Sequence, residues 1–339
     1  MRLQVEDGAG IKSEALWYSA PGVAEIRREV LPEPKPEQLA IRALYGAVSR
    51  GTERLVFEGR IPETEWQRMR APFQTGDFPH PVKYGYATVG VVEAGPDEWL
   101  DRAVFVLHPH QTLFCVPQDA VVSLPQALSP ARAVLAANME TALNAVWDSC
   151  AGPADRIAVV GAGVVGMLTA ALVNGFPGAN VTVIDKIPGR AAKAEAVGLK
   201  FCTSQDCSHL AGSCDTVFHA SGNPAGLALS MELCGFEGTV MEMSWYGSGD
   251  VPVPLGGSFH AQRLTLQSTQ VGHVARNRRP RWSHSRRLEA ALGLLLDSRF
   301  DTLLDEPVAF HDLPSHLPAL LNQTGSAVCP LIAYPDANV

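Results

Sequence analysis

The sequence contains no apolar run long enough to span a bilayer. Its longest uncharged apolar run, Ile157 to Val173, falls short of the roughly 20 residues that a transmembrane helix needs, and glycines interrupt it. The first residues, Met1 to Asp7, also lack the apolar segment of a secretory signal. We therefore expect a cytoplasmic protein that has no membrane partner.

Disulfide and zinc-binding patterns are absent as well. The seven cysteines are odd in number and scattered, and no two of them form a CxxC pair. Cys202, Cys207 and Cys214 follow one another at intervals of five and seven residues, a spacing that no common zinc site uses. The sequence thus predicts reduced thiols and no disulfide framework.

Positive charge is scarce overall. Lys and Arg number 27 against 35 Asp and Glu, and the resulting net charge of −8 gives no general attraction for nucleic acid. The one concentrated basic segment, which we call the arginine run, consists of Arg276, Arg278, Arg279, Arg281, Arg286 and Arg287. We expect it to form a solvated face or a contact between subunits; alternatively, it attracts an anionic substrate.

The most informative segment that is present is a glycine-rich turn between a strand and a helix. An apolar strand leads into the six residues Gly161-Ala162-Gly163-Val164-Val165-Gly166. Gly161 permits a tight turn, Gly163 lets a pyrophosphate approach the backbone, and Gly166 lets helix and strand pack closely. The following helix offers free N–H groups and a partial positive charge to phosphates. This pattern predicts that all six residues bind a dinucleotide.

A carboxylate at the end of the next strand supports this interpretation. The segment 181–185 is an apolar strand that ends in Asp185, 19 residues after Gly166. An acid at about this offset binds the ribose hydroxyls of the adenosine. A carboxylate there would also repel a 2′-phosphate, so we predict NAD as the cofactor rather than NADP. The alternative is a surface aspartate that ends an ordinary strand.

The hydrophobicity pattern predicts an α/β protein of two domains. The content is 46% hydrophobic and 18% charged, typical of a compact fold. Strand-like runs at 39–44, 89–92 and 103–107 indicate a β-rich first domain, and a helical pattern follows at 128–146. From Ile157 to Gly272 strands and helices alternate, which predicts a doubly wound parallel sheet. A helix is expected at 287–296, and the tail at 304–334 should return to the first domain.

The chain resembles the medium-chain dehydrogenase/reductase superfamily, the fold of alcohol dehydrogenases. Beside the glycine turn, the residues that carry the resemblance are Ser49-Arg50-Gly51-Thr52-Glu53, Gly85 to Gly90, and His219-Ala220-Ser221-Gly222. The resemblance implies a GroES-like catalytic domain at 1–138, a Rossmann domain at 139–298 and a return to the catalytic domain at 299–339. It also implies a homodimer. Ser49 to Pro62 is most similar to the branch that includes bacteriochlorophyllide a dehydrogenase, which oxidises a hydroxyethyl substituent on a large ring.

The places where this superfamily holds its catalytic zinc carry other residues here. By alignment with the family motifs, these places are Arg50, Tyr86 and Ala137. None of these side chains is a zinc ligand, and the cysteines of the family's structural zinc lobe are missing too. We therefore predict that the protein binds no metal.

Side chains must then replace the metal in catalysis. Arg50 could stabilise an alkoxide, and Tyr86 could transfer the proton with its pKa lowered by a neighbouring cation. The resemblance places Thr52 where the family uses a hydroxyl to relay the substrate proton. His110 is a further acid or base candidate, because imidazole titrates near neutrality. Alternatively, Arg50 pairs with a carboxylate such as Glu53, Tyr86 fills the vacated space, and His110 is structural.

The resemblance also extends the predicted cofactor site. Arg190 occupies a family position where a basic side chain contacts the adenosine ribose, and Ala220, Ser221 and Gly222 follow the strand whose backbone passes the nicotinamide ribose. These residues predict an NAD-dependent, zinc-independent oxidoreductase that interconverts a secondary alcohol and a ketone on a small molecule in a biosynthetic pathway. The alternatives are an NAD(P)H-dependent enone or quinone reductase and a dinucleotide-binding protein without catalysis.

Overall fold

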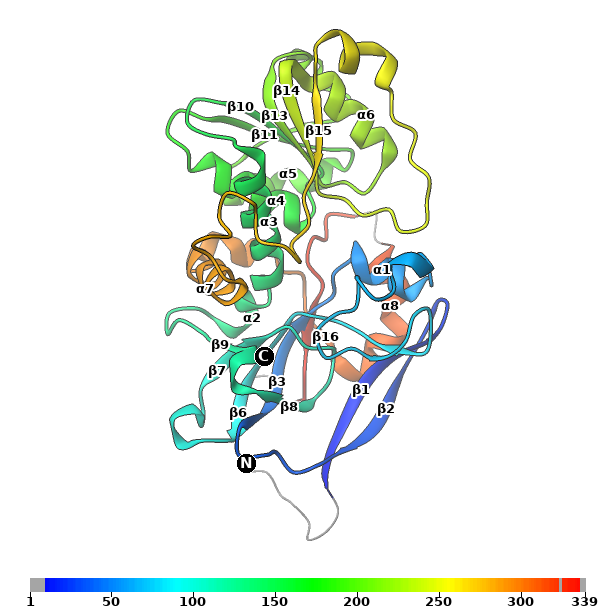
Figure 1. Cartoon of the computed structure of the whole chain (residues 1–339), viewed down its shortest axis with the longest axis vertical. Coiled ribbons are helices and arrows are strands. Elements are labelled where there is room, and N and C mark those ends of the chain that lie inside the picture. Colours follow the sequence, from blue (N-terminus) through cyan, green and yellow to red (C-terminus); the bar gives the residue numbers. More distant parts are fainter. Residues whose placement is uncertain (1–9, 323–324, 336–339) are drawn as a thin grey trace. The chain divides into compact units, whose positions relative to one another are not determined.

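The computed structural model describes residues 10–322 and 325–335. Contacts divide the chain into two compact units, which can be followed in Figure 1. The first unit comprises Met1–Ala137, Leu304–Gln323 and Cys329–Val339, and the second comprises Asn138–Leu303 and Thr324–Val328. The segment after Leu303 therefore returns mainly to the first unit. No helix among the described residues is long and apolar enough to cross a membrane.

The first unit contains two sheets that are antiparallel except for the parallel pair of β16 and β17. The four-stranded sheet has the order β2-β1-β5-β4, with β1 (Ile11–Ala20), β2 (Val23–Leu31), β4 (Thr75–Gly76) and β5 (Val82–Lys83). The seven-stranded sheet contains β3 (Gln38–Ala47), β6 (Thr88–Ala94), β7 (Ala103–Val106), β8 (Leu113–Pro117), β9 (Val121–Ser123), β16 (Val308–Ala309) and β17 (Leu331–Ala333). The strands predicted at 39–44, 89–92 and 103–107 are confirmed as β3, β6 and β7.

Short helices complete the first unit. They are α1 (Thr52–Phe57), α2 (Pro130–Ala133) and α8 (Leu313–Leu321), and α8 packs against β2. The single helical pattern predicted at 128–146 is divided, because α2 ends at Ala133 and α3 (Ala136–Ser149) begins a new helix. Ser129 caps α2 by accepting a hydrogen bond from the Arg132 N–H.

The second unit is built on one parallel sheet. Its six strands have the order β12-β11-β10-β13-β14-β15, with bounds β10 (Arg156–Val160), β11 (Asn180–Asp185), β12 (Lys200–Thr203), β13 (Cys214–His219), β14 (Cys234–Glu242) and β15 (Thr265–Ser268). This is the doubly wound order in which the chain leaves β10 first on one side and later on the other. The predicted α/β fold class with a β-rich domain is confirmed.

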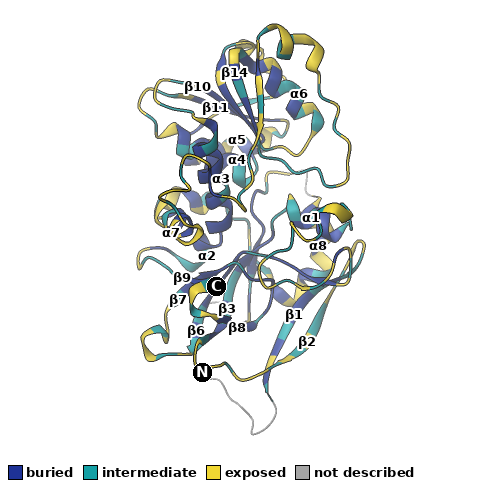
Figure 2. Cartoon of the chain, viewed as in Figure 1, coloured by how far each residue is buried: buried dark blue, intermediate teal, exposed yellow. Residues whose placement is uncertain are grey.

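The helices of the second unit cover both faces of this sheet. They include α4 (Val164–Asn174), α5 (Ala191–Val197), α6 (Pro224–Leu233) and α7 (His284–Leu294). Right-handed crossovers place α4 and α5 on one face and α6 on the other, as Figure 1 shows. The central strands β10, β11 and β13 are buried along most of their length, whereas the edge strands β12 and β15 are not, as the colours of Figure 2 indicate. The carboxyl ends of the strands, together with the turns that follow them, are thereby left to form a site.

Four of the seven cysteines lie in the core beneath α6. Cys207, Cys214 and Cys234 are buried there, and Cys202 packs against them. Burial raises the pKa of the Cys202 and Cys214 thiols to about 11. All seven cysteines are free, and these core thiols are held in their protonated form.

Candidate active site

The glycine turn joins β10 to α4, and at two of its positions the structure leaves no room for a larger residue. Gly161 has a φ of +115°, and a Cβ there would lie 2.7 Å from the Ala220 carbonyl carbon. A Cβ at Gly166 would lie 1.9 Å from the Gly161 oxygen. At Gly163, which precedes α4, a Cβ would meet no atom within 4 Å. The turn therefore leaves open space beside the first N–H groups of α4, and its residues fit the pyrophosphate of a dinucleotide.

Asp185 fastens the glycine turn to the end of β11. Its Oδ2 accepts hydrogen bonds from the Ala162 N–H at 2.7 Å and from Arg190 Nη1 at 2.7 Å, and its Oδ1 accepts the Ile187 N–H at 2.9 Å. A carboxylate offers about four acceptor sites, so these three bonds leave one for a ribose hydroxyl. Both side chains of the ion pair are buried, which makes Arg190 a partner of Asp185 and not a solvated arginine.

The turn Ala220-Ser221-Gly222 adjoins the glycine turn at the end of β13. The Ala220 N–H bonds to the Val160 oxygen at 2.8 Å, and the Gly161 backbone abuts Ser221. The Ser221 hydroxyl lies 2.6 Å from Nε2 of His219, which also contacts Glu242. Motif and resemblance in the sequence predict no role for His219 or Glu242. Their signal was a polar residue at the end of each of two neighbouring apolar strands.

Tyr86 lies in the first unit, in the segment before β6. Burial, followed by the negative charge of Glu53, raises the pKa of Tyr86 to about 12, and hydrogen bonds with Ser49 and Thr52 act in the opposite direction. The prediction of a pKa lowered by a cation is therefore wrong, because the charge that acts on the phenol is an anion. The structure brings Tyr86 and Thr52 together, with Tyr86 as a protonated phenol.

Glu53, whose charge acts on Tyr86, is the centre of a buried hydrogen-bonded cluster. Its carboxylate accepts hydrogen bonds from the Tyr18 hydroxyl at 2.6 Å, the Ser49 N–H at 2.7 Å and His110 Nε2 at 2.9 Å. Glu53 and His110 have no exposed surface. Gly85 is required beside the imidazole, because a Cβ there would lie 2.9 Å from His110 Nε2. His110 is thus placed as a partner of Glu53.

The three positions that correspond to zinc ligands in the resemblance do not fit a metal. Arg50 lies two residues before α1 and is partly exposed, and Ala137 is buried with only a methyl group to offer. Tyr86 is held as a neutral phenol. Across residues 10–322 and 325–335, no group of three or more His, Cys, Asp or Glu side chains is arranged to hold a metal ion.

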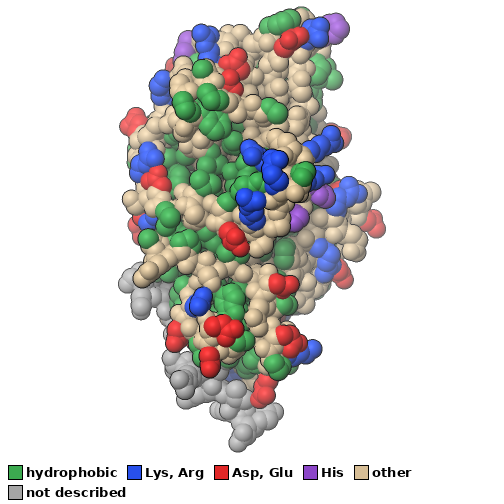
Figure 3. Space-filling model, turned by 60° about the vertical axis from the view of Figure 1, so that its left-hand side comes forward, with side chains coloured by type: hydrophobic (Ala, Val, Ile, Leu, Met, Phe, Trp, Pro, Cys, Tyr) green, Lys and Arg blue, Asp and Glu red, His purple; other side chains and the backbone are tan. Residues whose placement is uncertain are grey.

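The arginine run is divided between surface and core. Arg276, Arg279, Arg281 and Arg286 are exposed, and Figure 3 shows Lys and Arg side chains gathered on the face that carries α7. Arg286 lies 4.1 Å above the Trp282 ring, a cation–π contact. Arg287 is only 2% exposed and pairs with Glu140 at 2.9 Å. For Arg287, the expectation of a solvated face or subunit contact is wrong, because the helix turns this side chain inward.

No protein-family model matches the chain. Several solved structures match nearly all of it. They include 2R,3R-butanediol dehydrogenase from Bacillus subtilis, with a TM-score of 0.74, 18% identity and coverage of 95% of this chain and 99% of that one. The chain has the two-domain fold of medium-chain dehydrogenases.

Two further structures with this fold contain dinucleotides. A dehydrogenase from Sinorhizobium meliloti, described as zinc-binding and bound to NADP, has a TM-score of 0.74 and 17% identity over 95% of this chain and 99% of that one. A short chain alcohol dehydrogenase from Escherichia coli, complexed with NADH, has a TM-score of 0.74 and 14% identity over 96% of this chain and 100% of that one. At these identities the similarity establishes the fold and not the activity.

Proposed function

We propose that the protein is an NAD(H)-dependent, zinc-independent oxidoreductase of the medium-chain superfamily that interconverts a secondary alcohol and a ketone. The observation that carries this proposal is the glycine turn, with open space at Gly163 and close contacts at Gly161 and Gly166. Such a turn, at the start of a helix in a doubly wound sheet, is built to receive a pyrophosphate. The dehydrogenases that share the fold lend support.

The residues of the first unit supply the proton chemistry in this proposal. A nicotinamide dinucleotide, when bound, supplies hydride exchange with the substrate carbon. The Tyr86 phenol, protonated up to a pKa of about 12, donates a hydrogen bond to the ketone oxygen and gives its proton as the alcohol forms. Ser49 and Thr52 contact the phenol and can return a proton to it. In the oxidation of an alcohol the path runs in reverse: Tyr86 passes its proton to Ser49 or Thr52 as it takes the proton of the substrate hydroxyl.

The zinc independence in this proposal rests on the side chains at three positions. Arg50, Tyr86 and Ala137 stand where the resemblance implies metal ligands, and none of them binds zinc readily. Tyr86 replaces the metal as the group that meets the substrate oxygen. Arg50 adds positive charge in the same segment as Thr52, where it can stabilise a developing alkoxide.

The cofactor preference depends on the ion pair at the end of β11. We propose NAD, because Asp185 retains one acceptor site for a ribose hydroxyl. The second candidate is an NADPH-dependent enone reductase; Asp185 opposes this cofactor, and its ion pair with Arg190 is the observation that permits it. Arg190 offsets the charge that would repel a 2′-phosphate.

The substrate class follows from the resemblance at 49–62, and we propose a hydroxyalkyl or acyl side chain on a ring. We also propose that the protein acts as a cytoplasmic homodimer in a biosynthetic pathway. The exposed charges of the arginine run would suit an anionic ring substituent.

The decisive experiment is a fluorescence titration of the purified protein with NADH and NADPH. We expect NADH to bind at least tenfold more tightly; equal affinities would remove Asp185 as the selective residue and favour the enone reductase. Metal analysis should give far less than one zinc per chain. A screen of ring-bearing alcohols and ketones, followed by nicotinamide absorbance, tests turnover. Tight NADH binding without turnover on any of them would favour the non-catalytic alternative.

A further inference from the structure

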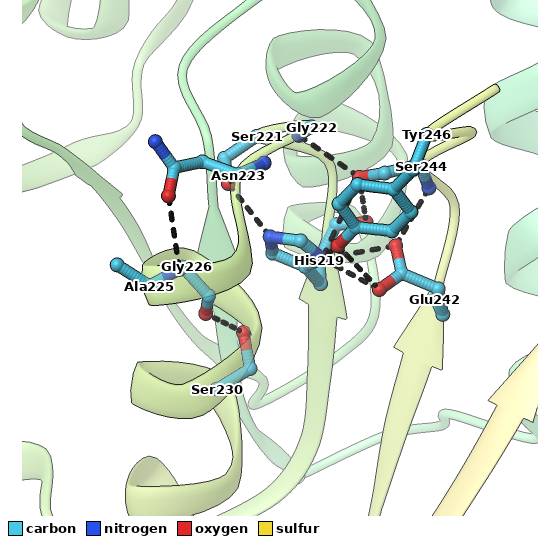
Figure 4. Close-up of polar contacts among 10 residues, drawn as sticks. All are labelled: His219, Ser221, Gly222, Asn223, Ala225, Gly226, Ser230, Glu242, Ser244 and Tyr246. Carbon is cyan, nitrogen blue, oxygen red and sulfur yellow. Dashed lines mark hydrogen bonds and ion pairs between the residues drawn. The ribbon is translucent and has the colours of Figure 1, made fainter. Parts of the chain in front are cut away.

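His219, Glu242 and the hydroxyl and N–H groups around them form one hydrogen-bonded network at the carboxyl ends of β13 and β14 (Figure 4). His219 and Glu242 end these strands and are register partners in the sheet. His219 Nδ1 lies 2.8 Å from Glu242 Oε2, and its Nε2 lies 2.6 Å from the Ser221 hydroxyl. The His219 ring has no exposed surface, whereas Ser221 is exposed. The buried imidazole thus connects the half-buried Glu242 carboxylate to one surface hydroxyl.

The partners of Glu242 determine which imidazole nitrogen carries the proton. Glu242 Oε1 accepts the Ser244 N–H at 2.7 Å, and Oε2 accepts the Tyr246 hydroxyl at 3.1 Å. Burial raises the pKa of Tyr246 and keeps it a donor. Carboxylate oxygens only accept hydrogen bonds, so the remaining contact, His219 Nδ1, donates as well. In the neutral imidazole, Nε2 then has a lone pair and accepts the Ser221 proton.

This arrangement determines the direction of the hydrogen bonds that the Ser221 hydroxyl makes. Its proton is directed to His219 Nε2, and its oxygen accepts the Asn223 N–H at 3.3 Å. One lone pair of the oxygen is left for a ligand, and it can only accept a hydrogen bond. Gly226 is needed for this packing, because a Cβ there would lie 2.2 Å from the Ser221 oxygen and 2.8 Å from His219 Nε2.

The position of Ser221 in the sheet indicates which ligand would use that lone pair. β11, which ends in Asp185, and β13, which precedes Ser221, flank β10 on opposite sides. The glycine turn at the end of β10 abuts the Ser221 backbone. A dinucleotide with its adenosine ribose at Asp185 and its pyrophosphate at the turn extends its other half toward Ser221.

We propose that Glu242 and His219 are positioning residues that hold the Ser221 oxygen as an acceptor for a hydrogen-bond donor in the nicotinamide half of the dinucleotide. The donor is a ribose hydroxyl or the carboxamide N–H. This inference rests on the proposed dinucleotide binding and adds to it the residues that recognise the second half of the molecule.

The Ser–His–Glu sequence of contacts also matches that of a hydrolytic triad, but the geometry favours binding. A triad needs N–H groups free to stabilise an oxyanion. Here the Gly222 N–H bonds to the Ser244 hydroxyl, the Asn223 N–H to Ser221 itself, and the Ala225 N–H to the Asn223 side chain. Pro224 has no N–H. The donors of this turn are therefore engaged.

The test compares the affinities for NADH and ADP, because ADP can occupy only the Asp185 side and the glycine turn. For Ser221→Ala we expect NADH to bind about fivefold more weakly, the equivalent of one hydrogen bond of about 1 kcal/mol, with ADP binding unchanged. Ser208→Ala, an exposed serine before the other end of β13, is the matched control and should change neither affinity.

Glu242→Gln tests the positioning role. A Gln amide can donate to Nδ1, which moves the imidazole proton to Nε2 and makes Ser221 accept it. We expect a loss of NADH affinity similar to that of Ser221→Ala, and the double variant should lose no more than either single one. Thermal unfolding without ligand reports general damage. A Glu242→Gln variant that weakens ADP and NADH equally would contradict the positioning role.

Nicotinic acid adenine dinucleotide distinguishes the two donors. If Ser221→Ala weakens it and NAD by the same factor, the donor is a ribose hydroxyl; if only NAD is affected, the donor is the carboxamide. Wild-type protein that binds neither NADH nor ADP would overturn the proposed function as well as this inference. If Ser221→Ala bound NADH as tightly as the wild type, this inference alone would be overturned.

Discussion

Tyr86 is a side chain whose environment specifies its chemistry. It faces the anionic cluster of Glu53, with two hydroxyl neighbours in Ser49 and Thr52. A phenol with a pKa near 12 is a poor base at neutral pH and an effective hydrogen-bond donor. The residue is therefore better suited to hold and protonate a ketone oxygen than to remove a proton unaided.

The variant Tyr86→Phe should lower turnover on the order of 10²-fold, because it removes the proton donor and keeps the ring. Binding of NADH should be unchanged, since the glycine turn is in the second unit. Steady-state rates and fluorescence titration measure the two effects. Tyr84→Phe is the control, a buried tyrosine of the same segment. Undiminished turnover in Tyr86→Phe would remove this residue from the mechanism.

At the scale of single residues, the sequence could predict side chains whose role depends on local geometry. Gly161 and Gly166 are readable in this way, because a tight turn and a close helix exclude any other residue. The raised pKa of Tyr86 could not be predicted from the sequence. It depends on Glu53, whose partners Tyr18 and His110 are 35 and 57 residues away along the chain. Likewise, Arg286 and Arg287 are neighbours in α7 that point about 100° apart around the helix axis, so that Arg286 is exposed and Arg287 is buried.

At the scale of elements, the strand–turn–helix from β10 to α4 combines two kinds of glycine. Gly166 is required for packing, whereas Gly163 borders open space. A substitution at Gly166 therefore tests the folding of the turn, and a substitution at Gly163 tests its use as a binding site.

We expect Gly163→Ala to fold normally and to bind NADH at least tenfold more weakly, because its methyl group would occupy the space beside the helix start. Gly166→Ala should instead lower the melting temperature, since its Cβ would lie 1.9 Å from a backbone oxygen. Thermal unfolding and NADH titration of both variants separate these effects. If Gly163→Ala bound NADH like the wild type, the pyrophosphate would not lie at this turn.

The elements themselves were largely predictable, because alternation and apolar runs mark strands and helices in both units. The break between α2 and α3 was not, since the residues between them, Val134 and Leu135, are apolar and buried like the helices on each side. The pairing of His219 with Glu242 was also hidden. It results from the register of β13 and β14, which the sequence does not specify.

At the scale of the whole molecule, buried tyrosines make the protein sensitive to alkali. Burial is the main cause that raises the pKa of Tyr18, Tyr84, Tyr86 and Tyr334, all in the first unit. A phenol whose pKa is higher in the folded state ionises first in the unfolded chain. Its stabilising contribution is intact below about pH 10 and is lost as the pH rises through the folded-state value.

We therefore expect the free energy of unfolding to fall steeply above pH 10. Tyr86 alone would account for at most about 3 kcal/mol between pH 10 and its folded-state pKa of about 12. Urea unfolding at pH 8, 9.5, 10.5 and 11 measures the slope, and Tyr86→Phe should reduce it. A free energy that is constant over this range would contradict the assigned pKa values.

The buried Arg287 has a practical consequence for anyone who engineers the surface of this protein. Its guanidinium joins α7 to Glu140 and Asn144 of α3 and to the Val271 and His273 carbonyls. Neutralising the exposed arginines beside it, to aid crystallisation or to reduce adsorption, should be well tolerated. Neutralising Arg287 as well would leave the buried Glu140 carboxylate without its cation, at a cost of about 3–5 kcal/mol.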